Sequence, residues 1–368
     1  MTTDESDYKI IRAQKRNILI TASLIEGNNL FSNGLHQNCL FLYRQFELIG
    51  YFPYFLINKK SNSVEEKQYR VCELTEFDTN PFPVYAFFIV AANCPESFRI
   101  FLKEKGTKIF TLFLGNILNI DIEKVTFGNR YNKHHSYGSN GTMLMSPHYH
   151  LSQDYSSALY DVYPNSKIAP YVWESSMIQD LVDMYKWSNE GPYGFSIMEP
   201  NISFQKCSLI PIMICEAFYR EKPSKIDGAV VINGDKLLSS TYFLTNILSK
   251  LDIYRDKRLF LINRLTIRDA AKGFKQNIII HHAVNNDYNY LFLEYLFMGF
   301  PVIHNYEMLK TYGYYYKGDD IEAGKNMIDY VLNTHGSNLE SYRASCKQLF
   351  WKFSIYNPDN IKGWKELL

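Results

Sequence analysis

The sequence lacks several features that would place it in a class at once. Its six cysteines form no CxxC pair and lie mostly in apolar runs, as reduced core cysteines do. No uninterrupted apolar run approaches the ~18 residues that span a bilayer, and the acidic start MTTDESDYK excludes a secretory signal. We therefore expect a cytoplasmic protein, and peripheral association with a membrane stays open.

An excess of one charge is also missing. The net charge is +1 over 368 residues, so bulk electrostatics indicate neither a nucleic-acid nor an acidic-membrane partner. From this balance we predict no nucleic-acid partner.

Two motifs are absent as well. There is no GxGxxG, which argues against a dinucleotide site, and no HExxH. Four histidines gather at His134, His135, His148 and His150, but no acidic residue stands at helical spacing from them, so we predict no metal site.

What is present indicates an α/β protein of two domains. Apolar residues make up 46% of the chain and charged residues 21%, as in ordinary globular proteins. Because short apolar strands alternate with helices in both halves, we expect parallel sheets covered on both faces. The predicted strands are 17–23, 54–58, 84–91, 108–114, 142–145, 167–173, 195–198, 229–233, 258–263, 277–281 and 301–303. The predicted helices are 33–48, 95–105, 174–187, 207–221, 239–251, 290–298, 321–332, 338–353 and 359–368.

The stretch SNEGPYG, with two glycines and a proline, is the best linker in the sequence. It predicts an N-terminal domain over 1–188, a linker over 189–194, a C-terminal domain over 195–349 and a terminal segment over 350–368.

The segment 285–305 carries the strongest functional signal. Residues 290–298 are apolar at almost every step except Glu294, which predicts a buried helix whose one carboxylate needs a polar partner. Gly299 ends this helix, and Pro301-Val302-Ile303 begins a buried strand.

The spacing from Glu294 to Gly299 and Pro301 resembles the end of the donor-binding motif of GT-B glycosyltransferases. The stretches SNGLHQNCLFLY, EPN followed by Lys206, CSLIPIMICEAFYREKP and GYYYKGDDIEAG are similar to an uncharacterised GT-B-type family of bacterial and large-DNA-virus proteins. The resemblance implies two Rossmann-like, doubly wound domains that face a central cleft. It also implies a UDP-sugar or GDP-sugar donor without cofactor or metal, and a glycan or lipid-linked glycan acceptor.

The resemblance also assigns roles to residues. Glu294 would bind the donor ribose, but the second glutamate of the motif, eight positions earlier, is Asn286 here, so amides replace a carboxylate. Since ligands of such folds bind after the strands, Lys206 and Arg264 are the candidates that stabilise the leaving diphosphate. Further candidates for donor binding are Asn33, Gly34, Gln37, Asn38, Glu199, Asn201, His282 and Asn285.

The acceptor needs a general base from the N-terminal domain. His36, in the loop that starts a helix, is the first candidate, and His148 and Glu26 are alternatives. Two other classes of function stay open, a catalytically silent GT-like module that binds a nucleotide or glycan, and a sugar epimerase. The donor base, the stereochemical outcome and the oligomeric state also stay open.

Overall fold

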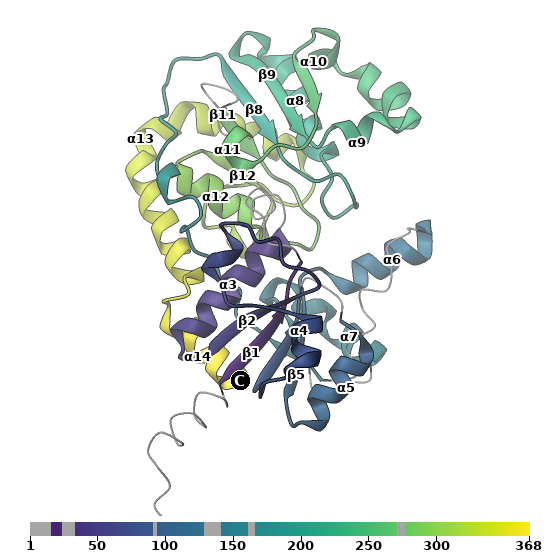
Figure 1. Cartoon of the computed structure of the whole chain (residues 1–368). Helices are drawn as coiled ribbons and strands as arrows, with labels where there is room; N and C mark the ends of the chain where they lie inside the picture. The colour runs from purple at the N-terminus through teal and green to yellow at the C-terminus, as the bar shows by residue number, and fades with distance from the viewer. Residues whose placement is uncertain are drawn as a thin grey trace, which may run out of the picture. The chain divides into compact units, whose positions relative to one another are not determined.

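The chain folds into two compact units of parallel sheet and helices, shown as a ribbon in Figure 1. This computed structural model describes residues 16–23, 34–90, 94–128, 141–160, 166–270, 272 and 277–368. Unit 1 comprises Met1–Glu174 and Phe353–Leu368, and unit 2 comprises Ser175–Lys352. No helix within these ranges is long and apolar enough to cross a membrane.

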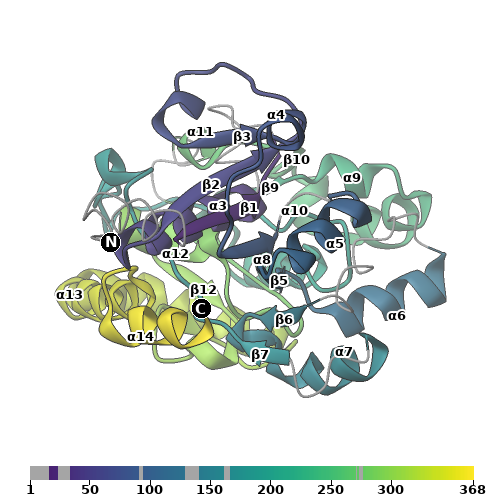
Figure 2. The ribbon, with the colours of Figure 1, turned by 60° about the horizontal axis from the view of Figure 1, so that its bottom comes forward.

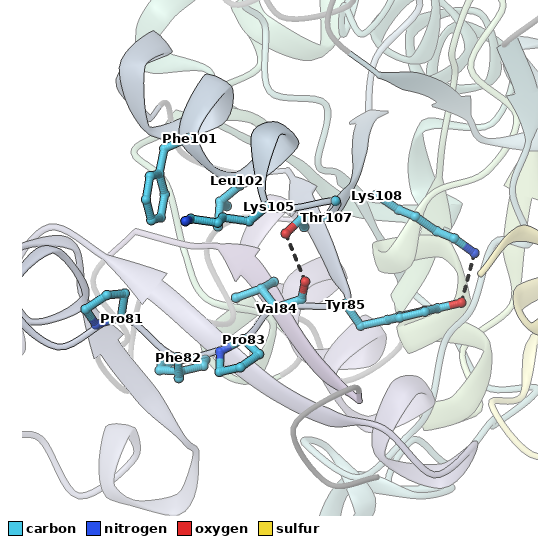
Figure 3. Close-up of a pocket in the computed structure, with 11 residues that line it drawn as sticks. Pro81, Phe82, Pro83, Val84, Tyr85, Phe101, Leu102, Lys105, Thr107 and Lys108 are labelled. Carbon is cyan, nitrogen blue, oxygen red and sulfur yellow. Dashed lines mark hydrogen bonds between the residues drawn. The ribbon is translucent and has the colours of Figure 1, made fainter. Parts of the chain in front are cut away.

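Unit 1 is built on a seven-stranded parallel sheet of order β3-β2-β1-β4-β5-β6-β7, which Figure 2 shows from a second direction. Its strands are β1 (Asn17–Thr21), β2 (Phe52–Ile57), β3 (Val71–Glu73), β4 (Ala86–Ile89), β5 (Lys108–Phe113), β6 (Thr142–Met145) and β7 (Ser166–Ile168). The strand order reverses between β1 and β4, so loops diverge at the carboxyl ends of these two strands. At the opposite edge of the sheet, the amino ends of β4 and β5 border an apolar cavity (Figure 3).

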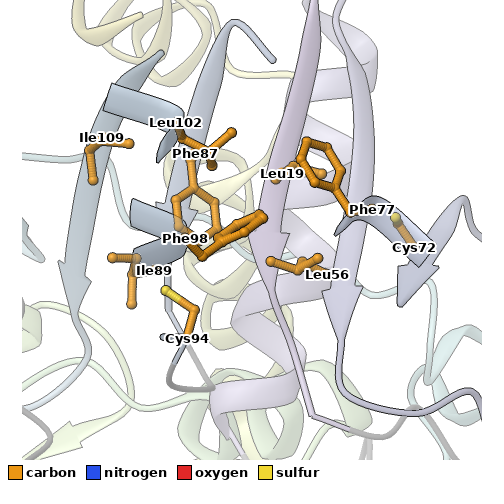
Figure 4. Close-up of a cluster of buried hydrophobic side chains, with 10 residues drawn as sticks. All are labelled: Leu19, Leu56, Cys72, Phe77, Phe87, Ile89, Cys94, Phe98, Leu102 and Ile109. Atoms are coloured by element: carbon orange, nitrogen blue, oxygen red, sulfur yellow. The ribbon is translucent and has the colours of Figure 1, made fainter. Parts of the chain in front are cut away.

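Helices cover both faces of this sheet, which explains its continuous apolar strands. They are α3 (Gly34–Leu48), α4 (Leu74–Thr79), α5 (Glu96–Glu104), α6 (Ile117–Phe127), α7 (Gln153–Tyr160) and α14 (Pro358–Leu367). On one face Phe87 meets Phe98 of α5 in a buried cluster (Figure 4). On the other face the next residue, Phe88, meets Phe46 of α3 and Trp364 of α14.

Unit 2 repeats this plan with a six-stranded parallel sheet of order β10-β9-β8-β11-β12-β13. Its strands are β8 (Tyr193–Ile197), β9 (Ile226–Ile232), β10 (Leu259–Ile262), β11 (Asn277–Ile280), β12 (Val302–His304) and β13 (Tyr314–Tyr315). The order reverses between β8 and β11. The prediction of an α/β fold with two Rossmann-like domains is confirmed.

Among the helices of unit 2, one has the bounds that the sequence predicted, and another spans two segments that the sequence predicted as separate helices. They are α8 (Leu209–Glu221), α9 (Asp235–Leu238), α10 (Asp252–Arg255), α11 (Ile267–Ala270), α12 (Tyr290–Met298) and α13 (Ile321–Phe353). Helix α12 ends at Gly299, whose φ of 90° is left-handed, as the sequence predicted. The break predicted after residue 332 is wrong, since α13 runs through Gly336, where a Cβ would meet Asn189 Oδ1 at 2.5 Å.

Two other predicted helices are not continuous helices. Over 239–251 the chain forms a π-helical turn (Phe243–Ile247) and a 3-10 turn (Leu248–Lys250). The hydroxyls of Thr245 and Ser249 donate to main-chain carbonyls there, which competes with regular helix.

Over 174–187 only the 3-10 turn Gln179–Leu181 forms. The N–H groups of Asp183 and Tyr185 donate to carbonyls at the end of α12, at 3.2 and 2.9 Å. This segment thus belongs to unit 2, which begins at Ser175 rather than at the predicted linker over 189–194.

Candidate functional site

The carboxyl ends of β8 and β11, where the strand order of unit 2 reverses, gather buried polar side chains. In doubly wound sheets this point is where ligands bind. Glu199 follows β8, and His281 and His282 follow β11. All three side chains are buried.

Glu199 joins these two strand ends. Its Oε1 accepts from His281 Nδ1 at 3.0 Å and from the main-chain N–H of His282 at 3.1 Å. With Nδ1 as the donor, His281 Nε2 presents a lone pair when the imidazole is neutral. Glu199 therefore holds the loop after β11 in a fixed position and sets the tautomer of His281.

Several buried polar atoms here have no hydrogen-bond partner among the described residues. They are Glu199 Oε2, His281 Nε2 and Ser208 Oγ. A buried polar atom without a partner costs about 1–3 kcal/mol, and natural proteins usually supply a water or a ligand to it. These atoms are thus the ones that a bound polar molecule would meet.

The EPN loop places Lys206 before helix α8. The Asn201 amide donates to the carbonyls of Glu199 and Asn233, at 3.1 and 3.2 Å, and accepts from the Ser208 N–H at 2.8 Å. Asn201 has a left-handed φ of 52°, which asparagine tolerates. Asn201 thus fixes the loop, and its amide is already engaged by the main chain.

Lys206 lies in this fixed loop, where its main-chain carbonyl accepts from Asn201 N at 3.1 Å. Burial lowers the pKa of Lys206, and the negative charge of Glu199 opposes that shift. The structure thus brings Glu199 and Lys206 into one electrostatic environment.

His282 connects the site to the loop that precedes α13. Its Nδ1 lies 2.8 Å from the Tyr316 hydroxyl, and its Nε2 lies 3.2 Å from Asp319 Oδ1. Burial lowers the pKa of His282, while the charges of Glu199 and Asp319 act in the opposite direction. Tyr316 and Asp319 were not among the predicted site residues.

The other predicted residues of unit 2 are spread more widely. Arg264 follows β10, the edge strand, and its side chain is exposed. Asn285 has a φ of 52°, and Asn286 is buried. Glu294 is buried in the middle of α12, as the apolar pattern predicted.

In unit 1 the strand order reverses beside His36. The His36 Nε2 is hydrogen-bonded to the hydroxyl of Ser23, two residues beyond β1. Burial lowers the pKa of His36, which favours the neutral imidazole.

The other predicted residues of unit 1 lie near the start of α3. Gly34 starts α3, Gln37 is buried, and the Asn38 amide donates to the Gly34 carbonyl at 3.3 Å. Asn33 and Glu26 lie outside the described residues, as do His134 and His135.

His148 is placed differently from His36. It lies in the 3-10 turn Pro147–Ser152, with its ring 3.8 Å from that of Tyr149. Within the described residues no group of three His, Cys, Asp or Glu side chains is placed to hold a metal ion.

No role was predicted for Ser208, and His281 was indicated only by its position at the end of a predicted strand. His281 directly follows the apolar strand NIII, and its position at a strand end was a usable signal. The hydrogen bond between Glu199 and His281 could not be predicted from the sequence pattern, because 82 residues separate the two in the chain.

Each unit is a Rossmann-like domain of the kind found in the GT-B fold, and solved structures of that fold match nearly the whole chain. An alpha-glucosyltransferase in complex with UDP-glucose and DNA superposes with a TM-score of 0.60, at 9% identity, over 95% of this chain and 99% of that one. Trehalose-6-phosphate synthase matches with a TM-score of 0.64, at 10% identity, over 96% and 98% of the two chains. Sucrose-phosphate synthase from Thermosynechococcus elongatus matches with a TM-score of 0.57, at 10% identity, over 96% of each chain.

The family of the chain is shown by its sequence. Residues 18–368 match one family over almost the full length, and the protein belongs to that family, described as "Protein of unknown function (DUF2827)". No curated protein matches the chain.

The prediction that nucleic acid is excluded as a partner is wrong. Structural neighbours of this fold are complexes with DNA, although they are only 9–10% identical to the chain. Net charge was a poor basis for that exclusion, because a nucleic acid contacts a local surface and does not sense the average charge of the chain.

Proposed function

We propose that the protein is a glycosyltransferase that moves a sugar from a nucleotide-sugar donor to a glycan or lipid-linked glycan acceptor, without a metal. The observation that carries the proposal is the buried polar group at the strand-order reversal of unit 2, formed by Glu199, His281 and His282 beside Lys206. It occurs in a fold whose solved neighbours include a glucosyltransferase with UDP-glucose.

Departure of a nucleoside diphosphate develops negative charge on the leaving oxygen. Lys206 lies just before α8, a 13-residue helix whose N-terminus carries partial positive charge. A bound diphosphate would raise the lowered pKa of Lys206 again, because an opposite charge favours the ammonium form. In the proposal Lys206 and the start of α8 therefore stabilise the leaving group without a metal. We keep Arg264, on the exposed loop after β10, as a second cation for the same diphosphate.

Glu199 has a different role in this proposal. An ionised carboxylate only accepts hydrogen bonds, so its Oε2 requires a donor and would repel a phosphate oxygen. The hydroxyls of a sugar are such donors. We therefore assign Glu199 to the transferred sugar, with His281 and the His282 N–H holding its other oxygen in place.

Glu294 is proposed to bind the ribose of the nucleotide. It is a buried carboxylate on α12, four positions after Tyr290, where that helix begins. Its two oxygens suit a pair of neighbouring hydroxyls. Asn285 and Asn286, at the start of the same segment, would contact sugar hydroxyls through amides.

The general base is proposed to be His36. A neutral imidazole is required to accept the acceptor's proton, and the lowered pKa of His36 favours that form. Its hydrogen bond to Ser23 orients the ring at the carboxyl ends of the unit 1 strands.

The test is release of UDP or GDP from a panel of nucleotide sugars in the presence of EDTA. We expect turnover of at least one donor by the wild type, and a loss of about 10²-fold or more in Lys206→Met, as for removal of a single electrostatic stabiliser. Lys236→Met is the matched control, since the Lys236 ammonium donates to the Pro200 carbonyl of the same loop at 2.8 Å. Absence of turnover with every donor, or full activity of Lys206→Met, would overturn the proposal.

A catalytically silent module that binds a nucleotide or glycan is the second candidate. One observation favours it, Asn286 in place of a carboxylate. A thermal-shift screen with UDP, GDP, ADP and CMP separates the candidates, because a ligand at a hundred times its Kd adds about 2.7 kcal/mol of stability. Binding without turnover of any donor would select the silent module.

A further inference from the structure

Unit 1 contains a sizeable cavity at the amino ends of β4 and β5 (Figure 3). Its volume is about 700 Å³, within the range of small-molecule sites. The segment before β4, the end of α5 and the turn into β5 line it, namely Pro81, Phe82, Pro83, Val84, Tyr85, Phe101, Leu102, Lys105, Gly106, Thr107 and Lys108.

A second cavity of about 380 Å³ extends the first along α5. The two share Pro81 and Phe101, and the second reaches Pro95 and Ser97 at the start of that helix. The nine residues of α5 span ~13 Å at 1.5 Å per residue. The two cavities, together called the α5 groove, are therefore long enough for an extended chain.

The walls of the α5 groove offer few hydrogen-bonding groups. The Val84 carbonyl accepts from the Thr107 hydroxyl at 2.9 Å, and the Pro83 carbonyl accepts from Asn17 Nδ2 at 3.0 Å. Pro81 and Pro83 have no N–H to donate. The lining therefore favours a ligand that is apolar along most of its length, which a nucleotide sugar is not.

Charge is distributed unevenly along the α5 groove. The Lys105 ammonium lies 5.7 Å from the centre of the Phe101 ring, and no described residue forms an ion pair with it. The Lys108 ammonium turns toward the Tyr85 hydroxyl at 2.8 Å (Figure 3). Among the described residues no acidic side chain lines the larger cavity, and Asp78 lines the smaller one. An anionic head thus suits the Lys105 end, with an apolar tail directed toward Pro95.

We propose that the α5 groove binds a single-chain aliphatic anion, such as an alkyl carboxylate or alkyl phosphate, with its head at Lys105. The α5 groove lies on the face of the sheet where Phe87 meets Phe98, whereas His36 belongs to α3, which packs on the opposite face, so the two sites of unit 1 are separate. Its occupant is therefore not the group that reacts in the proposed transfer, and the proposal is independent of that function.

The test is calorimetric titration of the full chain with octanoate, decanoate, dodecanoate and dodecyl phosphate, each below its micelle concentration. Each added methylene should tighten binding about four-fold, as the transfer free energy of a methylene group implies. Dodecanol should bind at least five-fold more weakly than dodecanoate. No binding by the wild type, or an affinity that does not depend on chain length, would overturn the proposal.

Substitutions locate the head and the tail. Lys105→Glu should reverse the preference, so that dodecylamine binds more tightly than dodecanoate, whereas Lys103→Glu on the same helix, outside the groove, should change neither. Phe101→Asp places a carboxylate in the groove at a side chain that is 37% exposed, and should abolish dodecanoate binding, while a cooperative thermal melt checks that the variant is folded. Equal effects of the Lys105 and Lys103 substitutions would show adsorption to the surface and refute the site.

Discussion

At the scale of single residues, unit 2 contains buried histidines, of which His304 has both ring nitrogens engaged. His304 Nε2 lies 2.6 Å from the Tyr312 carbonyl, and its Nδ1 accepts from the Tyr306 N–H at 3.1 Å, which requires a neutral ring. Burial lowers the pKa of His304 to about 3 and that of His335 to about 4. Both values lie below the ordinary histidine pKa near 6.5.

These shifts predict acid sensitivity. Because the unfolded chain binds protons below pH 6.5 and the folded chain does not, stability is highest above pH 6.5 and falls as the pH drops toward 3. Each such histidine should lower the free energy of unfolding by about 1.4 kcal/mol for each pH unit over most of that window. Urea unfolding of unit 2 at pH 7, 6 and 5 measures this, and His304→Asn should reduce the slope. A slope unchanged by that substitution would contradict the assignment to His304.

A second prediction at this scale concerns Glu199. Glu199→Ala removes the acceptor of two buried N–H donors, at His281 and His282, and should lower the free energy of unfolding by about 2–5 kcal/mol. Glu199→Gln keeps one acceptor oxygen in the same shape and should cost clearly less. Denaturant titration compares the two variants. Equal stability of the alanine and glutamine variants would mean that neither hydrogen bond contributes.

At the scale of elements, α12 shows a helix whose end is encoded locally. Gly299 has a φ of 90°, and its N–H and that of Phe300 close the last turn by donating to Leu296 and Tyr295. A Cβ at Gly299 would meet its nearest neighbour at 3.4 Å, so space is sufficient and the conformation alone resists substitution.

Gly299→Ala should therefore destabilise unit 2 by about 1–2 kcal/mol, the cost of a left-handed backbone for a residue with a Cβ. Gly299→Asn should cost less, because asparagine tolerates this conformation. Thermal melts of the two variants provide the comparison, and an alanine variant as stable as the wild type would argue against a left-handed Gly299.

At the scale of the whole molecule, each unit is completed by contacts between distant parts of the chain. Trp364 of α14 is fully buried against Phe46 and Phe88, which lie about three hundred residues earlier in the sequence. The C-terminal segment is therefore part of the core of unit 1.

Trp364→Ala should destabilise unit 1 by about 3–5 kcal/mol, the usual range for a buried aromatic. Amide hydrogen exchange should show faster exchange in β1 and β4 and little change in β8 and β11. Trp351→Ala is the control, since that side chain is 55% exposed. Increased exchange confined to unit 2 would contradict the placement of α14.

The sequence alone determined the α/β class, most strand positions, the bounds of α12 and the glycine that ends it. These properties follow from apolar periodicity and backbone preferences, which act over a few residues. Only the tertiary structure decided that unit 2 begins at Ser175, that α13 is continuous, that Glu199 meets His281 and that a groove runs along α5. Each of these depends on which distant segments satisfy one another's hydrogen bonds and fill one another's space, and residue spacing along the chain does not contain that information.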